Sequence, residues 1–170
     1  MDRRRAAKKP LDLHERALRL LAVRPRSRRE LQVRLRAAGF EPDRIEEELI
    51  RLEEVGLVDD EAFAREVAEH HVTARRGGRR AVVGALAAKG VSRRVIEEAV
   101  ADLGQDEEER ALELARQRAP RLAELPPEKA FGRLSSLLMR RGYEPATARE
   151  AARRALGALD DEENTRLEGV

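Results

Sequence analysis

The chain has 170 residues, of which 40% are charged and only 2% are aromatic. Leu, Val, Ile and Ala must therefore supply any hydrophobic core, and a sequence rich in Ala, Leu, Glu and Arg favours helices over strands. The absence of cysteine excludes disulfides and thiolate metal sites. No apolar run follows the basic N-terminus or approaches the roughly 18 residues of a membrane span, so we expect a cytoplasmic protein.

The formal net charge of +2 hides an alternation of basic and acidic stretches. Residues 1–36 carry 13 Lys or Arg against 4 Asp or Glu, whereas residues 41–61 carry 2 against 10. Residues 75–94 then carry 7 basic side chains and no acidic one, and residues 97–113 carry 1 against 8. A charge pattern that returns along the chain indicates repeated structural units.

The first unit shows the signals of three helices in succession. An opening helix is followed by a tight connector and then by Ser27, which is predicted to form a capping box with Glu30. Gly39 ends the second helix, because a C-terminal cap commonly requires a residue in the left-handed conformation. A proline then opens a third helix over residues 42–54, at a position where its missing N–H costs nothing.

The second unit repeats this order. Asp59 and Asp60 supply the acidic first turn that the helix dipole favours at the start of a helix over residues 60–73. A longer connector rich in arginine and glycine leads to a middle helix that ends at Gly90. Ser92 stands at the N-cap of the third helix, where its hydroxyl accepts a backbone hydrogen bond.

The third unit differs from the others in its connector and in its core. Its opening helix, over residues 107–119, is followed by a long connector from Pro120 to Pro127 and by a glycine turn at Gly142. Alanine occupies core positions where the first two units have Ile, Leu or Val. We therefore expect the third unit to be the least stable of the three.

Registering the three units on their glycines aligns their apolar positions, at spacings of three and four residues that define one helical face. The coinciding positions are Leu31, Val82 and Leu134; Leu35, Leu86 and Leu138; Ile45, Ile96 and Ala148; Leu49, Val100 and Ala152; and Leu52, Leu103 and Ala155. The sequence thus predicts an all-α fold of three tandem three-helix repeat units in an elongated, curved array. The expected divisions are a basic disordered tail at 1–11, units at 12–58, 59–104 and 105–159, and an acidic disordered tail at 160–170.

Catalytic chemistry is not indicated. Adjacent residues on a helix point about 100° apart, so His70 and His71 cannot share a metal ion, and His14 lies far from both in the sequence. The sequence contains no zinc-protease motif and no glycine-rich phosphate loop between a strand and a helix. Its carboxylates fall in runs typical of a solvated face. We expect no enzymatic activity, no metal and no cofactor.

Basic residues cluster around the middle helices and are the candidates for binding. The cluster members are Arg24, Arg26, Arg28, Arg29, Arg75, Arg76, Arg79, Arg80, Lys89, Arg140 and Arg141. For any single arginine, simple exposure to solvent is the better interpretation. The clustering of these arginines nevertheless favours contact with phosphates or an acidic groove. Phe40, Phe63, Phe131 and Tyr143 fall at core-like positions, so base stacking is not expected and nucleic-acid contact would have low sequence specificity.

The order of these motifs resembles the RecX family of regulatory proteins, over about residues 13–158. The residues that carry the resemblance are Ser27, Glu30, Leu31, Leu35, Gly39, Asp59, Asp60, Phe63, Leu86, Gly90 and Gly142. We interpret them as helix caps and core residues and assign binding to the arginines.

The resemblance implies a monomeric modulator, usually an inhibitor, of the RecA recombinase, with roles in DNA repair, recombination and the SOS response. Such a protein binds the filament of RecA on single-stranded DNA and hinders strand exchange, filament growth and ATP hydrolysis. Direct contact with single- or double-stranded DNA through phosphates remains open at this point. So does the choice between occupying the filament groove, capping filament ends and competing for DNA.

Two other functions are compatible with the same sequence. Three-helix units with a glycine turn are common in helix-turn-helix DNA-binding proteins, although the third helix of the first unit carries Glu46, Glu47 and Glu48, which a phosphate-lined groove would repel. A helical-repeat scaffold for protein interactions is the other alternative, and it predicts no dependence on DNA.

Overall fold

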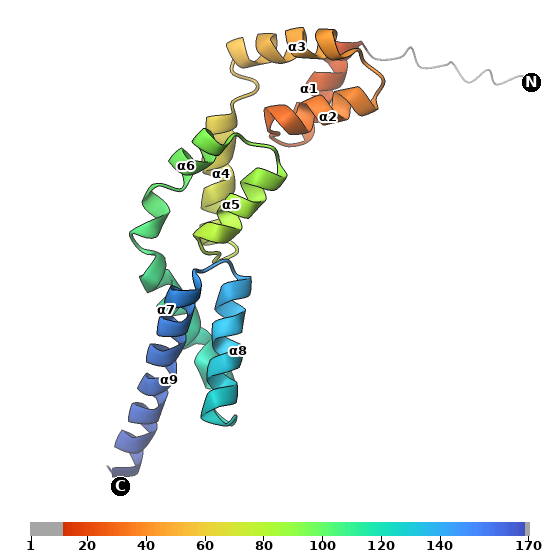
Figure 1. The fold of residues 1–170 in the computed structure, drawn as a ribbon. Coiled ribbons are helices and arrows are strands. Elements are labelled where there is room, and N and C mark those ends of the chain that lie inside the picture. Colours follow the sequence, from red (N-terminus) through yellow and green to blue (C-terminus); the bar gives the residue numbers. More distant parts are fainter. Residues whose placement is uncertain (1–11, 169–170) are drawn as a thin grey trace, which may run out of the picture. The chain divides into compact units, whose positions relative to one another are not determined.

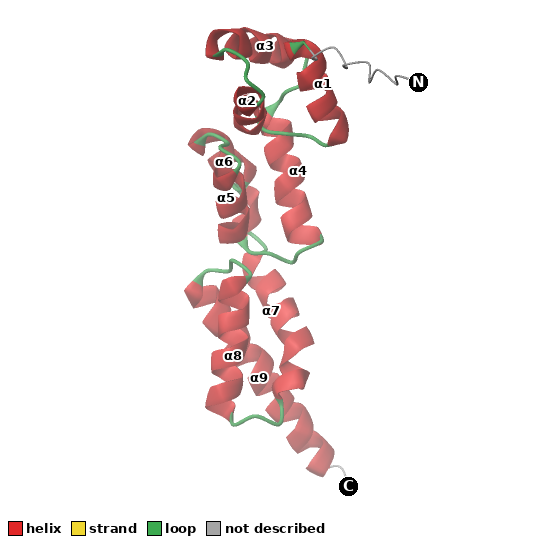
Figure 2. Ribbon diagram, turned by 90° about the vertical axis from the view of Figure 1, so that its right-hand side faces the viewer, coloured by secondary structure: helices red, strands yellow, loops and turns green. Residues whose placement is uncertain are grey.

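The computed structural model describes residues 12–168, with side chains placed as far as residue 158. Within this part the chain forms helices and no strand (Figure 2). The helices are α1 (Leu13–Val23), α2 (Arg28–Ala37), α3 (Pro42–Glu54), α4 (Asp60–Thr73), α5 (Arg79–Ala88), α6 (Arg93–Ala99), α7 (Glu107–Arg118), α8 (Pro127–Arg140) and α9 (Pro145–Glu168), with 3₁₀ turns η1 (Asp102–Gly104) and η2 (Ala119–Leu122). The all-α fold of three three-helix repeats is confirmed.

The chain packs as two compact units, and each is described by itself. Unit 1 comprises residues up to Phe63 together with Lys89–Val91, and unit 2 comprises Ala64–Ala88 and the chain from Ser92 onward. The first turn of α4 and the glycine turn after α5 therefore belong with α1, α2 and α3.

Unit 1 is built around an aliphatic core in which α1, α2 and α3 each contribute one face (Figure 1). Leu31 and Leu35 of α2 and Leu49 of α3 are fully buried, as their spacing predicts. The capping box at the start of α2 is present, because Ser27 Oγ accepts from Glu30 N at 3.1 Å and the Glu30 carboxylate accepts from Ser27 N. Local sequence thus sets the helix ends, and hydrophobic periodicity sets the packing.

Unit 2 has its main core between α7, α8 and α9, which lie side by side (Figures 1 and 2). Leu134 and Leu138 of α8 are fully buried against the small faces of Ala148 and Ala152 on α9. Tyr143 is only 1% exposed and belongs to the same core. The alanines of the third repeat therefore let α9 pack closely against α8. The expected lower stability of the third repeat stays a prediction.

Two expectations for the helices are wrong. The aligned face of the second repeat was expected to continue to Leu103, but α6 ends at Ala99 and Leu103 lies half-buried in η1, where it donates to the Val100 carbonyl at 3.2 Å. Beyond α6 the chain adopts the tighter 3₁₀ geometry, which turns Leu103 away from the direction that a continued α-helix would give it. Residues 160–168, expected to be disordered, continue α9 as a helix, since no Pro or Gly interrupts them. The basic tail at 1–11 lies outside the described residues.

Candidate functional site

Each unit contains one joint at which the start of a middle helix packs against a glycine turn. In unit 1, which holds the α2 joint, Ser27 Oγ donates to the Lys89 carbonyl at 2.5 Å and Arg28 N donates to Asp60 Oδ1 at 2.8 Å. The Arg29 side chain lies over Gly90, and a Cβ there would stand 2.7 Å from Arg29 Cβ. The turn thus holds the N-terminus of α2 by direct hydrogen bonds.

Unit 2 holds the corresponding α5 joint, where the start of α5 meets the turn between α8 and α9 (Figure 1). Gly78 N donates to the Arg141 carbonyl at 2.9 Å, and Arg80 N donates to the Gly142 carbonyl at 3.1 Å. Arg79 N donates to Glu107 Oε1 at 3.0 Å. The first N–H groups of α5, which have no partner within the helix, are therefore satisfied inside the protein.

The backbones at the α5 joint approach so closely that glycine is needed on both sides. A Cβ at Gly78 would lie 2.6 Å from Tyr143 N, and a Cβ at Gly142 would lie 2.5 Å from Ala81 Cβ. Gly142 also has a φ of +88°, a conformation that L side chains rarely adopt. The Gly77-Gly78 pair is thus half of a tight contact between two segments distant in the sequence.

Most candidate cations of unit 1 are paired with carboxylates. Arg24 Nη2 donates to Glu30 Oε1 at 2.8 Å, and Lys89 Nζ lies 3.5 Å from the same oxygen and 5.6 Å from the centre of the Phe63 ring. Burial raises the pKa of Glu30, but its hydrogen bond to Arg24 and the charges of Lys89 and Arg24 outweigh burial, so the pKa is lowered. These cations stabilise unit 1 rather than remaining available to a partner.

Arg28 forms ion pairs with two carboxylates, and Arg26 is buried. The Arg28 guanidinium pairs with Glu46 and, through Nε at 2.9 Å, with Glu53. Arg26 is only 7% exposed, and its Nε donates to the Leu20 carbonyl at 3.0 Å near the C-terminal end of α1. The prediction that Arg26 belongs to a binding surface is therefore wrong, because the tight connector turns this side chain inward.

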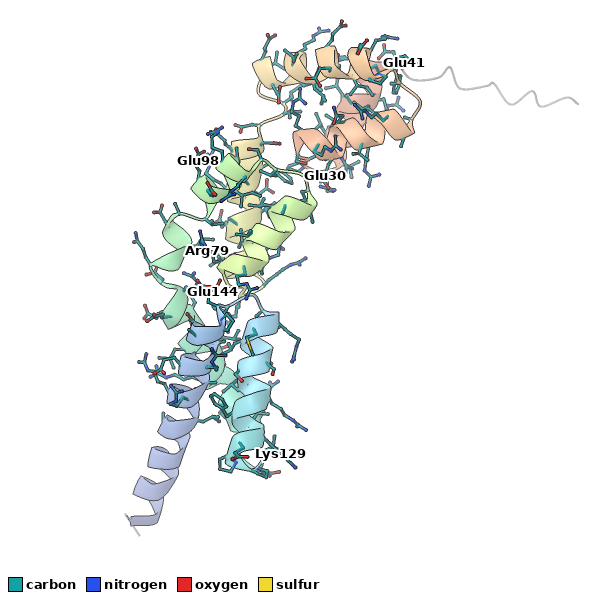
Figure 3. All side chains as sticks on the ribbon, in the orientation of Figure 1. Glu30, Glu41, Arg79, Glu98, Lys129 and Glu144 are labelled. Atoms are coloured by element: carbon teal, nitrogen blue, oxygen red, sulfur yellow. The ribbon has the colours of Figure 1, made fainter. Side chains whose placement is uncertain are left out.

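The candidate cations of unit 2 gather at the α5 joint, where one of the six has a carboxylate partner among the described residues. This surface, here called the α5-joint cluster, comprises Arg75, Arg76, Arg79, Arg80, Arg140 and Arg141, all of them exposed. Arg80 Nε lies 3.8 Å from Glu144 Oε1, the one carboxylate within ion-pair distance of the cluster among the described residues (Figure 3 labels Arg79 and Glu144). Arg141 Nη1 donates to the Arg75 carbonyl at 2.6 Å, which ties the two segments together.

A hollow of about 230 Å³ adjoins the α5-joint cluster. Arg76 and Arg110 contribute to its wall together with Tyr143, whose hydroxyl donates to the Arg76 carbonyl at 3.2 Å. Arg76 has a φ of 49°, a left-handed backbone that side chains seldom adopt. Arg110 Nη2 donates to the Leu103 carbonyl at 2.5 Å, while its buried Nε has no partner among the described residues. Burial raises the pKa of the Tyr143 phenol, which therefore stays a hydrogen-bond donor at neutral pH.

No motif or spacing in the sequence singles out Arg110, Glu107 or Gln117. Glu107 is 7% exposed, and its carboxylate accepts from Arg79 N at the start of α5. Gln117 accepts a hydrogen bond from Arg76 Nη1. These residues belong to the site through contacts between distant segments, and no spacing within the sequence signals them.

The residues that carry the resemblance include helix caps and buried side chains. Asp59 Oδ1 accepts from the amides of Glu61 and Ala62, both at 2.9 Å, so Asp59 caps α4. Phe63 is 6% exposed beneath Lys89, and Leu86 is fully buried. The described residues contain no group of three or more His, Cys, Asp or Glu placed to hold a metal ion. None of the helices in that same part has the length and apolarity to cross a membrane.

Helical repeats joined at glycine turns, with an exposed arginine cluster at one joint, define an all-α repeat protein. Three successive segments match the family models described as the first, second and third three-helix domains of RecX, at residues 14–52, 59–100 and 106–152. The chain belongs to the RecX family of regulatory proteins.

Individual relatives agree with this assignment. The regulatory protein RecX of Streptomyces coelicolor is 39% identical over 140 residues, which cover 82% of this chain and 74% of that protein. The regulatory protein RecX of Mycolicibacterium smegmatis is 43% identical over 137 residues, covering 77% and 72%. The crystal structure of RecX from Lactobacillus salivarius has a TM-score of 0.75 at 21% identity and covers 84% of this chain and 93% of that one, so it shares the fold.

Proposed function

We propose that this protein binds the filament that RecA forms on single-stranded DNA and inhibits the recombinase and ATPase activities of RecA. The observation that carries the proposal is the match of all three three-helix segments, in order, to the domains of one regulatory family. A regulator of this kind needs no active site of its own, because RecA performs the hydrolysis.

We assign the contact with polyanionic surface to the α5-joint cluster. Six guanidinium groups from two distant segments gather there. Among the described residues, the one carboxylate within ion-pair distance of them is that of Glu144, whose Oε1 lies 3.8 Å from Arg80 Nε. Such a concentration of uncompensated positive charge attracts phosphates, and guanidinium groups donate to phosphate oxygens with two parallel hydrogen bonds. Since the backbone N–H groups at the start of α5 are already used within the joint, the side chains are the donors offered to a ligand.

The paired cations of unit 1 have a smaller part in this proposal. Binding a phosphate through Arg24 or Arg28 would first require breaking ion pairs to Glu30, or to Glu46 and Glu53. Arg29 is the exposed exception, with Gln32 as its partner at 2.6 Å. The effective binding surface is therefore smaller than the set of eleven cations that the sequence suggests.

The proposal is tested first by titrating this protein into the DNA-dependent ATPase assay of RecA from the same organism. We expect inhibition that saturates at or below one protein per RecA. Inhibition well below that ratio indicates that filament extension is blocked, and inhibition only near saturation indicates occupancy along the filament. An unchanged rate at equimolar protein contradicts the proposed function.

A triple variant then tests the assignment of the surface. Replacing Arg75, Arg79 and Arg140 with Ala removes three exposed guanidinium groups that have no side-chain partner among the described residues. We expect weaker binding to single-stranded DNA and to the filament, with the slope of log affinity against log salt reduced by about 2, because each phosphate contact contributes about 0.7.

The control variant carries the same change in net charge elsewhere, at the exposed residues Arg36, Arg44 and Arg51 of unit 1. We expect it to keep both the affinity and the salt slope of the parent protein. Equal losses in the two triple variants indicate a response to net charge alone and contradict the assignment. Binding to DNA without any effect on RecA assigns the chain to the DNA-binding alternative.

A further inference from the structure

One arginine of unit 2 has a backbone conformation for which the described chain otherwise uses glycine. The other described residues with a positive φ are Gly39, Gly56, Gly90 and Gly142. Arg76 has a φ of 49° just after α4, although Gly77 and Gly78 follow it directly. A residue with a Cβ is strained in this region, and strain of this kind clusters at binding sites and switch regions. The position therefore indicates that Arg76 is present for its side chain.

The Arg76 side chain contributes to the wall of the 230 Å³ hollow beside the α5 joint. The wall is built from three segments that are distant in the sequence, with Thr73 at the end of α4, Leu114 on α7 and Tyr143 after α8. All three segments belong to unit 2, so the hollow forms within one compact unit. It is larger than the roughly 30 Å³ of a water molecule and smaller than the roughly 300–1,000 Å³ of a pocket for a drug-sized ligand. Its size therefore suits a small ion or a single chemical group.

Positive charge exceeds negative charge in the wall. Arg76 and Arg110 both line the hollow, and Glu113 is the carboxylate that lines it with them. Glu113 Oε1 already accepts a hydrogen bond from Gln117 Nε2 at 3.0 Å. The hydroxyl of Tyr143 is likewise used, because it donates to the Arg76 carbonyl at 3.2 Å. The two guanidinium groups are therefore the donors that the wall offers to a ligand.

The hydrogen-bonding capacity of these guanidinium groups is only partly used within the protein. Arg76 donates through Nη1 to Gln117, and Arg110 donates through Nη2 to the Leu103 carbonyl at 2.5 Å. Arg110 Nε is buried and has no hydrogen-bond partner among the described residues. A buried donor on a charged group is costly to leave unpaired. An anion with several oxygens would supply the acceptors that the wall lacks.

We propose that the hollow is a binding site for one phosphate group, held by the guanidinium groups of Arg76 and Arg110. A phosphate monoester carries close to two negative charges and three strong acceptor oxygens, so it accepts from both arginines at once. A carboxylate carries one charge, and a single guanidinium already satisfies its two oxygens. Inorganic phosphate and the terminal phosphate of a nucleic-acid strand share this chemistry. The proposal does not rest on the proposed function, because it concerns unit 2 and requires no RecA.

Titration of the full chain with inorganic phosphate tests the proposal, with the arginine Nε–H and Gln117 amide resonances followed by NMR. We expect saturable shifts of the Arg110 Nε–H and Gln117 signals that chloride at equal ionic strength does not produce. Arg76→Gly removes one guanidinium group and relieves the strained backbone. The phosphate affinity of this variant should therefore fall at least about tenfold, while its urea midpoint stays equal or rises. Arg133→Ala, which removes an exposed arginine of α8 outside the hollow, should keep the affinity of the parent.

A second pair of probes distinguishes the two sources of phosphate. A short single-stranded oligonucleotide with a terminal phosphate is compared with the same oligonucleotide ending in a hydroxyl. Tighter binding of the phosphorylated strand, lost in Arg76→Gly, identifies a strand terminus as the ligand, whereas shifts with inorganic phosphate alone identify the free ion. The absence of a saturable Arg110 shift with both phosphate probes overturns the proposal.

Two results with the variants also overturn it. Equal losses of phosphate affinity in Arg76→Gly and Arg133→Ala would mean that the protein responds to net charge alone. A lower urea midpoint of Arg76→Gly with unchanged phosphate affinity would assign the Arg76 side chain a purely structural role.

Discussion

Replacing Gly142 with Ala is expected to destabilise unit 2 through two separate effects. The first is conformational, because the φ of +88° places the new Cβ too close to the following carbonyl, at a cost of about 1–2 kcal/mol. The second is steric, because that Cβ would lie 2.5 Å from Ala81 Cβ at the start of α5. The joint must open to accommodate it.

The size of the steric effect follows from what the open joint loses. Two backbone hydrogen bonds cross the joint, from Gly78 N to the Arg141 carbonyl and from Arg80 N to the Gly142 carbonyl. Each contributes about 0.5–1.5 kcal/mol net, so their loss adds about 1–3 kcal/mol. The expected total for Gly142→Ala is about 2–5 kcal/mol in the free energy of unfolding.

Gly56→Ala is the control, because Gly56 also has a positive φ, +71°, but nothing lies within 4 Å of a Cβ built there. This variant should lose only the conformational part, about 1–2 kcal/mol. Urea unfolding followed by far-UV circular dichroism measures both losses, and hydrogen exchange of the Gly78 and Arg80 amides reports opening of the joint. Equal losses in the two variants, with those amides still protected, would refute the close-packed joint.

Three further predictions concern the cores and the charges of the protein. His14→Ala removes the partner of Glu48, which is 8% exposed and accepts no other hydrogen bond from a described residue. This change should cost about 1–3 kcal/mol in urea unfolding, whereas adding Glu48→Gln should recover part of the loss. Leu35→Ala and Leu86→Ala remove fully buried side chains and should each cost about 2–5 kcal/mol, while unchanged stability in both would contradict the repeat alignment. The lowered pKa of Glu30 means that its contribution to stability is present above the ordinary carboxyl pKa and is lost as pH falls through the folded-state value. The difference in urea midpoint between the parent and Glu30→Gln should accordingly shrink on acidification.

The helices and the core faces follow from the sequence because their causes are local. Ser27 and Glu30 form a capping box across a single turn, and the apolar face of α2 depends on residues three and four apart. The aligned positions Leu31, Val82 and Leu134 are all fully buried. Leu103 departs from this rule because α6 ends at Ala99 and the chain continues into the 3₁₀ turn η1, which has fewer residues per turn.

The identity of the available cations could not be read from the sequence, because pairing acts through space. Arg28 and Arg79 occupy equivalent positions at the start of α2 and α5. The Arg28 guanidinium meets Glu46 and Glu53 of α3, whereas no carboxylate of the described residues lies within ion-pair distance of the Arg79 guanidinium. Arg26 is removed from the surface altogether by the direction of its connector. Only the folded chain decides which charges neutralise one another.

The sequence by itself determined the three-helix repeat, its caps and its buried positions, since hydrogen bonds and periodicity within one or two turns suffice to specify them. The tertiary structure alone decided that Arg75 and Arg141, 66 residues apart, share one surface at the α5 joint. The physical reason is that this surface depends on the close approach of Gly78 and Gly142, and backbone contact between distant segments leaves no periodic signal in the sequence.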